Sequence, residues 1–288
     1  MAQTATTGNL ENASRTIIAA SKYTEEHNAP AMALIEKFIL QKGSRAITVP
    51  KVAQMTVSDL TDGQDIVDEE DIGMTTVSLT ASEVGAKIIL TDKLVREQQT
   101  NVFTIIGKQL GDAMARKKDT DVHSLYTSLN GGTTLGAAAA EASLSNIAGA
   151  IAYAKANKFG TEIYILQHPN AVFDIAAGAV TASQYAIPKG WSEDLLGNFW
   201  SGIRPLNGVP IFEDGNLSVD SLDDAIGVIA DKSALAVLQS VDSRTERQRD
   251  ASMRATEVVI VADYGVAELD DSRGAPLTFD AAAPSSSA

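Results

Sequence analysis

The chain contains no cysteine among its 288 residues. Disulfide bonds and thiolate metal sites are therefore excluded, and the absence is compatible with a reducing cytoplasm. No apolar run approaches the roughly 20 residues that a membrane-spanning helix needs. The N-terminal residues lack the basic and apolar regions of a secretory signal. We therefore expect no association with a membrane.

Positive charge is also scarce, because 23 Lys and Arg stand against 37 Asp and Glu, giving a formal net charge of −14. A protein that binds nucleic acid through its phosphates normally presents a basic face. Half of the net negative charge lies in one segment without Lys or Arg, whose acids are Asp59, Asp62, Asp65, Asp68, Glu69, Glu70 and Asp71. A solvated loop is the simplest interpretation. Calcium binding is the alternative, because Ca²⁺ prefers carboxylate oxygens, but the spacing does not match an EF-hand loop.

The motifs of common enzymes are missing as well. There is no Gly-x-Ser-x-Gly elbow, no phosphate-binding Gly-Lys-Ser/Thr loop and no Gly-x-Gly-x-x-Gly run after a strand. His27, His123 and His168 are not spaced from one another, or from a carboxylate, as metal ligands are. We expect all three to be structural or solvated, and we expect no catalytic residue, no metal and no cofactor.

Two strand-like runs joined by the acidic segment are the most informative feature that is present. The first run covers residues 46–52, and the second covers 77–81 and continues through 84–90. A lone two-stranded hairpin is marginal in water, and an exposed strand edge invites pairing with another chain. Because no neighbouring segment looks able to cover these strands, we expect an extended hairpin over residues 46–90 that completes its burial on another copy of the protein.

One helix is predicted before this hairpin in the sequence and one after it. Residues 31–40 have the pattern of a short amphipathic helix within a polar N-terminal arm, 1–45. Apolar residues from Phe103 to Met114 recur at three- or four-residue spacing and predict a long helix over about 101–130, which the sequence from Asn130 to Gly132 would end. A helix of that length would act as a spine for its segment, residues 91–133.

The next region alternates between helix and strand patterns, which predicts an α/β domain over residues 134–240. Ser145 is expected to cap a helix that Gly160 closes, and a second helix is expected from Asn170. Buried-type strands are predicted at 162–166, 209–212 and 225–230.

The C-terminal region, residues 241–280, returns to strand patterns. Strands are predicted at 258–262 and 264–269, followed by a turn from Asp271 to Gly274. The low-complexity tail, 281–288, is predicted to be disordered.

A basic stretch opens this C-terminal region, with Arg244, Arg247 and Arg249 interrupted by Glu246 and Asp250. A DNA-contacting face is one interpretation of this stretch. Ion pairs between subunits are the preferred one, because the planar guanidinium meets carboxylates in a bidentate way. We expect these arginines to pair with the acidic hairpin tip of a neighbouring copy. The residues of this predicted contact are Asp65, Asp68, Glu69, Glu70, Asp71, Arg244, Arg247 and Arg249.

Four segments, taken in order, resemble passages of the major capsid proteins of tailed bacteriophages, which share the HK-ninety-seven-like fold. They are VGAKIILTDKL at 84–94, EIYILQHP at 162–169, LNGVPIF at 206–212 and DYGVA at 263–267. The resemblance implies an α+β fold in six parts: an N-terminal arm (1–45), an extended hairpin loop (46–90), the spine helix of a peripheral domain (91–133), an α/β axial domain (134–240), return strands of the peripheral domain (241–280) and a disordered tail (281–288).

The same resemblance implies a structural function without enzymatic activity. Copies would assemble in the host cytoplasm, as pentamers and hexamers, into the icosahedral head shell of a virion that encloses double-stranded DNA without reading its sequence. A portal protein and scaffolding or decoration proteins would be partners. Two alternatives stay open: an encapsulin-type nanocompartment shell, and an α/β enzyme that uses the middle domain.

Two features depart from some members of the resembled family. Some crosslink a Lys of the extended loop to an Asn of a neighbour, but the acidic tip holds no Lys, and Lys51 and Lys87 lie away from it. We therefore expect no covalent crosslink. Some also carry a long N-terminal scaffolding region, which we expect here to be absent, already removed or supplied as a separate protein.

Overall fold

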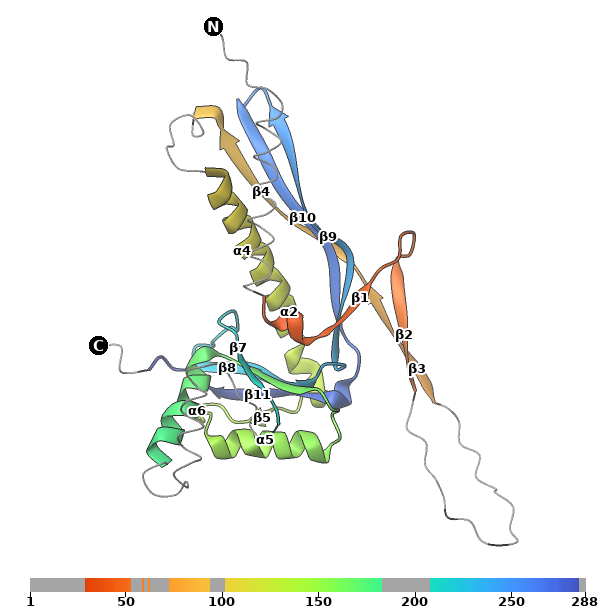
Figure 1. Ribbon diagram of the computed structural model, residues 1–288, viewed down its shortest axis with the longest axis vertical. Helices are drawn as coiled ribbons and strands as arrows, with labels where there is room; N and C mark the ends of the chain where they lie inside the picture. Colours follow the sequence, from red (N-terminus) through yellow and green to blue (C-terminus); the bar gives the residue numbers. More distant parts are fainter. Residues whose placement is uncertain are drawn as a thin grey trace.

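The computed structural model describes residues 29–52, 59, 62, 73–93, 102–182 and 208–284. A long sheet with one helix along it forms one end of the molecule, a globular part with its own sheet and helices forms the other, and a hairpin projects away from both (Figure 1). The predicted α+β class is confirmed. No helix in the described ranges is long and apolar enough to cross a membrane.

The long sheet has four strands in the order β1-β9-β10-β4, with bounds β1 (Glu36–Ile39), β4 (Ser82–Thr91), β9 (Leu235–Asp250) and β10 (Ala255–Glu268). β9 and β10 form an antiparallel ribbon, β4 pairs antiparallel with β10, and β1 pairs parallel with β9. The register of the ribbon shifts around Asp263, which marks a β-bulge at mid-length. A bulge bends and twists its strand, so the two halves of the ribbon can serve different parts of the molecule.

Helix α4 (Val102–His123) lies along this sheet (Figure 1). Its buried stripe includes Ile106, Leu110 and Met114, which belong to one core cluster with Val258 and Ile260 of β10. Apolar side chains at every third or fourth residue of α4 thus pack against apolar side chains at every second residue of β10 and form a single hydrophobic layer.

The long helix ends earlier than the predicted residue 130, so that prediction was wrong in length. After His123 the chain tightens into a 3-10 segment, η1 (Tyr126–Gly132), in which Tyr126 and Leu129 are fully buried. The Ser124 and Ser128 hydroxyls donate to backbone carbonyls three residues earlier, and such side-chain bonds compete with helical ones. The predicted left-handed stop is in place, because Asn130 has φ 58° and Gly131 has φ 60°.

The helix predicted over residues 31–40 is also wrong beyond its first turn. Only α2 (Ala31–Leu34) is helical, and the following residues form β1 against the first part of β9. Phe38 and Ile39 suit a strand, and the free edge of β9 supplies backbone partners that a short isolated helix cannot match. Tertiary pairing therefore overrides the local periodicity here.

The globular part is built on a five-stranded sheet in the order β5-β11-β8-β6-β7, with bounds β5 (Leu135–Gly136), β6 (Ile163–Gln167), β7 (Ile211–Glu213), β8 (Asp224–Asp231) and β11 (Gly274–Asp280). Helices α5 (Leu144–Ala156) and α6 (Pro169–Ala182) complete it. The strands predicted at 162–166, 209–212 and 225–230 and the helix from Asn170 are therefore confirmed within one or two residues. The N-cap of α5 is Ser143, whose hydroxyl accepts from the Asn146 amide at 3.3 Å, and not the predicted Ser145.

Two segments lie in a different sheet from the one that the predicted domain boundaries imply. β9 begins at Leu235, so the last residues of the predicted axial segment belong to the long sheet. Conversely, β11 pairs with β8 and lies in the five-stranded sheet, although residues 241–280 were expected to return to the long one. Both differences arise because the chain passes from the five-stranded sheet to the long sheet between the consecutive strands β8 and β9. It later returns, and β11 pairs with the edge of β8 that β6 does not occupy.

The projecting hairpin consists of β2 (Ala46–Val52) and β3 (Met74–Thr80). The second predicted run does not stay in it, because residues 82–91 leave as β4 and pair with β10 over ten positions. The expectation that nothing covers residues 84–90 was therefore wrong: the chain itself supplies their neighbour, which lies more than 160 residues away in sequence. The uncovered part is limited to the hairpin proper.

Candidate assembly surfaces and a polar junction

The base of the hairpin is anchored by a small core of its own. Ile47 pairs with Leu79 and Val49 pairs with Val77, so four apolar side chains share one face. Leu79 is 1% exposed and packs with residues of β9 in a separate cluster. The hairpin thus leaves the body from a fixed point.

The far end of the hairpin strands carries apolar side chains that the described chain does not cover. Val52 and Met74 are directly paired in register and are 56% and 62% exposed. Within the described residues each hairpin strand has only the other as a neighbour, so each presents one bare backbone edge. Exposed edges with apolar ends are the features that pair with other chains.

Two contacts fix the hairpin against the C-terminal end of β10. Lys51 Nζ forms an ion pair with Asp270 Oδ1 at 2.5 Å. A Cβ added to Gly265 would lie 1.9 Å from the Thr80 carbonyl oxygen, so β3 crosses β10 at a distance that only glycine allows. Lys87, the other lysine considered for crosslinking, pairs with Glu257 at 2.7 Å.

The predicted basic strip lies on the far half of β9, where its arginines are exposed. Arg249 is already engaged within the chain: its two guanidinium nitrogens donate to the two Asp92 oxygens at 2.6 and 2.7 Å, and this contact raises the arginine pKa. Arg244 Nε lies 3.1 Å from Glu246 on the same strand. The strip therefore ties β9 to the end of β4 and presents Arg244 and Arg247 outward.

Asp65, Asp68, Glu69, Glu70 and Asp71 lie outside the described residues, as does His27. Within the described ranges, no group of three or more His, Asp or Glu is arranged to hold a metal ion.

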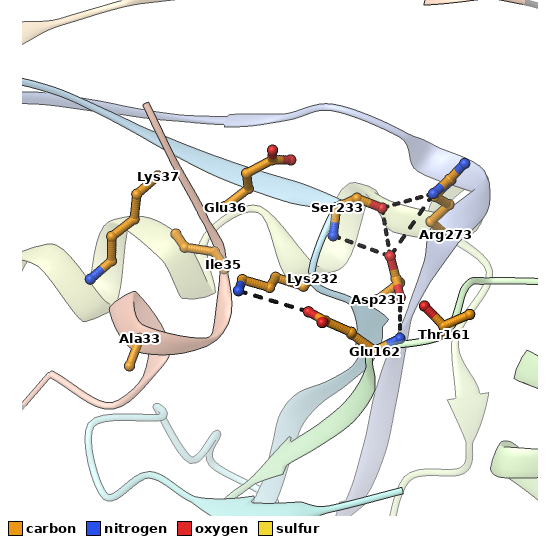
Figure 2. Close-up of a pocket in the computed structure, with 10 residues that line it drawn as sticks. All are labelled: Ala33, Ile35, Glu36, Lys37, Thr161, Glu162, Asp231, Lys232, Ser233 and Arg273. Atoms are coloured by element: carbon orange, nitrogen blue, oxygen red, sulfur yellow. Dashed lines mark hydrogen bonds and ion pairs between the residues drawn. The ribbon is translucent and has the colours of Figure 1, made fainter. Parts of the chain in front are cut away.

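A cavity of about 730 Å³ lies where the N-terminal segment meets the globular part (Figure 2). Its lining residues are Ala33, Ile35, Glu36, Lys37, Thr161, Glu162, Asp231, Lys232, Ser233 and Arg273.

The polar groups of this cavity are bonded mainly to one another. Asp231 accepts from the Glu162 amide at 2.9 Å and from the Ser233 hydroxyl at 2.5 Å, and Arg273 lies 3.9 Å away (Figure 2). Lys232 lies 3.7 Å from the Glu162 carboxylate. The Ser233 hydroxyl donates to a carboxylate, and the lining contains no histidine that could act as its base. The cavity joins segments and offers no nucleophilic set for the enzyme alternative.

A second polar group is buried where α4 meets the loop that follows β7. His123 Nε2 lies 2.9 Å from Asp214 Oδ2, and the Asn216 side-chain amide donates to Asp119 Oδ2 at 2.8 Å. The Asn216 backbone N–H donates to Asp214 Oδ1 at 2.8 Å, which ties the two loop residues together. Asp119 and Asp214 are 0% and 2% exposed. Two bridges therefore connect the spine helix to the globular part.

The electrostatics of this junction are unusual. Burial, and then the nearby Asp214 carboxylate, raise the pKa of Asp119 from 3.8 to about 7, while the Asn216 hydrogen bond, His123 and the Ala31 amide act in the opposite direction. Asp119 Oδ1 has no hydrogen-bond partner of good geometry in the described part of the chain, and the same holds for the Tyr126 hydroxyl. Burial raises the pKa of Tyr126 further above its ordinary value.

Sequence reasoning missed this junction. Asp214 lies 91 residues from His123, and Asn216 lies 97 residues from Asp119, so no local spacing reveals either pair. The one available signal was Asp119 itself, a carboxylate among the helix positions that face the core.

A family model described as phage capsid protein matches residues 74–276, well over half of the chain. No curated protein sequence matches significantly.

Solved structures from several phages share the fold. The head structure of Helicobacter pylori bacteriophage KHP40 superposes with a TM-score of 0.67 at 13% identity, over 86% of this chain and 89% of that one. The mature capsid of bacteriophage PhiM1 gives 0.65 at 14% identity, over 88% and 87%. A structure from Mycobacterium phage Che8 gives 0.62 at 19% identity, over 82% and 84%. At these identities the likeness establishes the fold, and it extends over nearly the whole length of both partners.

Proposed function

This chain belongs to the phage capsid protein family, and from that premise we propose that its copies join as pentamers and hexamers into an icosahedral shell around double-stranded DNA. It is a structural major capsid protein with the HK-ninety-seven-like fold, and its place is the capsid of the virion. The proposal concerns how the copies hold together and what the shell contains.

The hairpin is the observation that carries this proposal. Val52 and Met74 are more than half exposed at the end of a two-stranded sheet, and no other described strand pairs with its outer edges. Burying one such side chain is worth about 1.5–3 kcal/mol relative to leaving it exposed, and hydrogen bonding along the edges adds to this gain. Contact with a neighbouring copy would both bury these side chains and supply hydrogen-bond partners for the strand edges. The hairpin then acts as an arm that reaches across a subunit boundary.

The charged contact is the second part of the proposal. We place the acidic tip (Asp65, Asp68, Glu69, Glu70 and Asp71) against Arg244 and Arg247 of a neighbour, because both arginines project from the far half of β9. Arg249 contributes less to this proposed contact, because its guanidinium already donates two hydrogen bonds to Asp92 of the same chain.

The contents of the shell follow from charge. With a net charge of −14, the protein repels the phosphate backbone on average, so DNA is held by confinement and not by tight, sequence-specific binding. A portal protein and scaffolding or decoration proteins complete the proposed set of partners. The protein itself carries out no reaction, which fits a cavity whose polar groups neutralise one another.

The test is a double variant, Val52→Asp with Met74→Asp, which places two charges on the surface that we propose to be buried between copies. Assembly is followed by sedimentation and negative-stain microscopy. We expect closed particles from the unaltered protein and only small species from the variant, while circular dichroism of the unassembled chain stays the same, because both positions are exposed there.

The matched control is Ile105→Asp, the same kind of change at a residue of α4 that is 46% exposed. Normal particles from the Val52/Met74 double variant would contradict the role given to the hairpin. The content of particles purified from an infected host is a separate readout: double-stranded DNA supports a virion, whereas a co-purifying enzyme would support the nanocompartment alternative.

A further inference from the structure

The geometry of the buried junction points to a second role for the spine helix. We propose that Asp119, His123, Asp214 and Asn216 form a proton-operated latch between α4 and the loop after β7. The latch is closed while Asp119 carries a proton and loosens when that carboxyl ionises. This property belongs to a single chain and does not depend on the proposed mode of assembly.

The latch joins two parts that also share a hydrophobic core, because the buried face of α4 and Leu217 of the loop after β7 belong to one cluster. α4 packs on the four-stranded sheet, whereas β7 is the edge strand of the five-stranded sheet and pairs only with β6 there. The His123–Asp214 and Asn216–Asp119 bridges span this boundary at 2.9 and 2.8 Å. β7 has only three residues, so we expect the loop after it to be the element that moves when the bridges weaken.

One carboxyl in the cluster has to be neutral for the closed geometry to be favourable. Asp119 and Asp214 are both almost completely buried, and two ionised carboxylates in one dry site repel each other and lose their hydration. A protonated Asp119 avoids both costs. Its Oδ2 still accepts from Asn216, and the proton can reside on Oδ1, which has no well-aligned hydrogen-bond partner among the described residues.

The groups that face Asp119 from the surrounding elements set its charge. From its own helix these are His123 and, one residue away, Lys118, whose Nζ is directed toward Ser243 and the Tyr264 ring. The η1 segment contributes Tyr126, α2 contributes the Ala31 amide, and the loop contributes Asp214, while Tyr164 of β6 acts on Tyr126.

The remaining charges lie one step further out. His168 lies at the end of β6. Burial lowers its pKa, and the nearby Asp214 carboxylate acts in the opposite direction. Asp231 senses Tyr164, and Asp121 accepts from the Tyr264 hydroxyl at 2.8 Å. Asp214 is thus the group of like charge closest to Asp119, and one histidine is shared between the two carboxylates.

The switch operates near neutral pH. Because the pKa of Asp119 is raised to about 7, roughly nine in ten molecules hold the proton at about pH 6, and roughly one in ten holds it at about pH 8. Ionisation at pH 8 is relieved most easily by letting water reach the carboxylate, which requires the loop to move away from α4.

Hydrogen–deuterium exchange of the full-length protein tests the latch. Peptides that cover residues 211–219 and 114–124 are followed at pH 6 and pH 8, with rates corrected for the intrinsic effect of pH. In the unaltered protein we expect protection in these peptides to fall about tenfold between the two values, in line with the rise of the ionised fraction from roughly one in ten at pH 6 to roughly nine in ten at pH 8. Peptides from α5 should not change.

The informative variant is Asp119→Asn, because the asparagine side chain imitates the neutral carboxyl: it accepts from Asn216 and carries hydrogen on its other terminal atom. We expect its protection to be the same at pH 6 and pH 8. The matched control is Asp112→Asn on the exposed face of the same helix, which should keep the pH dependence of the unaltered protein.

A second variant keeps the proposal open to refutation if Asp119→Asn does not fold. Asn216→Ala removes a hydrogen bond that lowers the pKa of Asp119, so the transition should move to higher pH. The proposal is overturned if the 211–219 peptide shows no pH dependence in the unaltered protein, if Asp119→Asn retains that dependence, or if Asn216→Ala moves the transition to lower pH.

Discussion

The five-stranded sheet and the projecting hairpin use the same kind of backbone but differ in burial. All five residues of β6 are buried, whereas Leu79 is the only buried residue of β2 and β3. The sheet is enclosed by α5, α6 and its neighbouring strands, and its core is complete within one chain. The hairpin buries its base and leaves its far end bare. Within the described residues, a single copy thus buries the apolar side chains of the five-stranded sheet and leaves those at the far end of the hairpin exposed.

This difference separates stability from assembly. Changes in the enclosed sheet should reduce the free energy of unfolding of the unassembled chain, because they remove contacts that one copy makes with itself. Changes in the hairpin should leave that free energy almost intact and act on association. The two regions can then be distinguished by two measurements on the same set of variants.

The largest effect is expected from Phe279→Ala in β11. Phe279 is 0% exposed and belongs to the core beneath the five-stranded sheet. Replacing a buried Phe by Ala leaves a cavity and costs about 3–5 kcal/mol. Chemical denaturation of the unassembled chain measures this loss. The control is Leu222→Ala, at a side chain that is 74% exposed, which should change the free energy by less than about 0.5 kcal/mol. Similar losses from both variants would break the comparison.

The next effect is the pH dependence of stability at the junction between the two regions. The folded pKa of Asp119 is about 7 and its ordinary value is 3.8, so the folded chain holds a proton that the unfolded chain releases between these values. This contribution is fully present below the ordinary pKa and is lost as the pH rises through the folded one. Between pH 5 and pH 7 it should fall by about 2 kcal/mol.

Denaturation of the unassembled chain at pH 5 and pH 7 gives the measurement, taken as the difference between the unaltered protein and Asp119→Asn. That subtraction removes the contribution of the other carboxyls, which Asp119→Asn shares. A difference that stays constant with pH, or that grows from pH 5 to pH 7, would mean that Asp119 is not protonated in the folded chain.

A smaller effect is expected where the hairpin meets the body. Gly265→Ala places a Cβ 1.9 Å from the Thr80 carbonyl oxygen, so β3 has to shift away from β10. Overpacking of this kind costs about 1–3 kcal/mol, and it also redirects the hairpin, so assembly should suffer more than folding. Denaturation and sedimentation together separate the two effects.

Gly149→Ala is the matched control for this change. An added Cβ at Gly149 meets nothing within 4 Å, and the residue lies within α5. Alanine there should stabilise the chain by about 0.5–1 kcal/mol, because glycine is unfavourable in a helix interior. Equal destabilisation by both substitutions would show that the crossing at Gly265 has no special constraint.

The sequence predicted the enclosed region better than its connections. The alternation of apolar runs located β6, β8 and α6 closely, because each of these elements buries side chains in a local pattern. It did not show that β11 joins β8, or that β4 pairs with β10. Such pairings depend on which edges are free after the chain has folded back, and this information is not contained in any short segment.

The same limit applies to the sites. The hairpin was predicted from its two runs and its turn, because β2 and β3 are close in sequence. The junction around Asp119 depends on partners almost a hundred residues away, so composition and spacing gave no indication of it. The Arg249–Asp92 pair was missed for the same reason. It shows that one of the three arginines of the basic strip holds β9 to the end of β4, while Arg244 and Arg247 are exposed on the same strand.

The smallest effect on folding is therefore expected from Arg244→Glu with Arg247→Glu. Both side chains are exposed on β9, and pairs between exposed charges contribute little to the stability of a single chain. The unfolding midpoint should stay the same. Between copies the same two changes bring negative charge toward the acidic tip, so assembly followed by light scattering should slow, most clearly at low salt where screening is weak. Lys108→Glu with Lys155→Glu makes an equal change of net charge away from the strip and separates a specific contact from general repulsion. If both double variants slow assembly equally, the arginines act only through net charge, and the proposed specific contact between copies is confined to the hairpin.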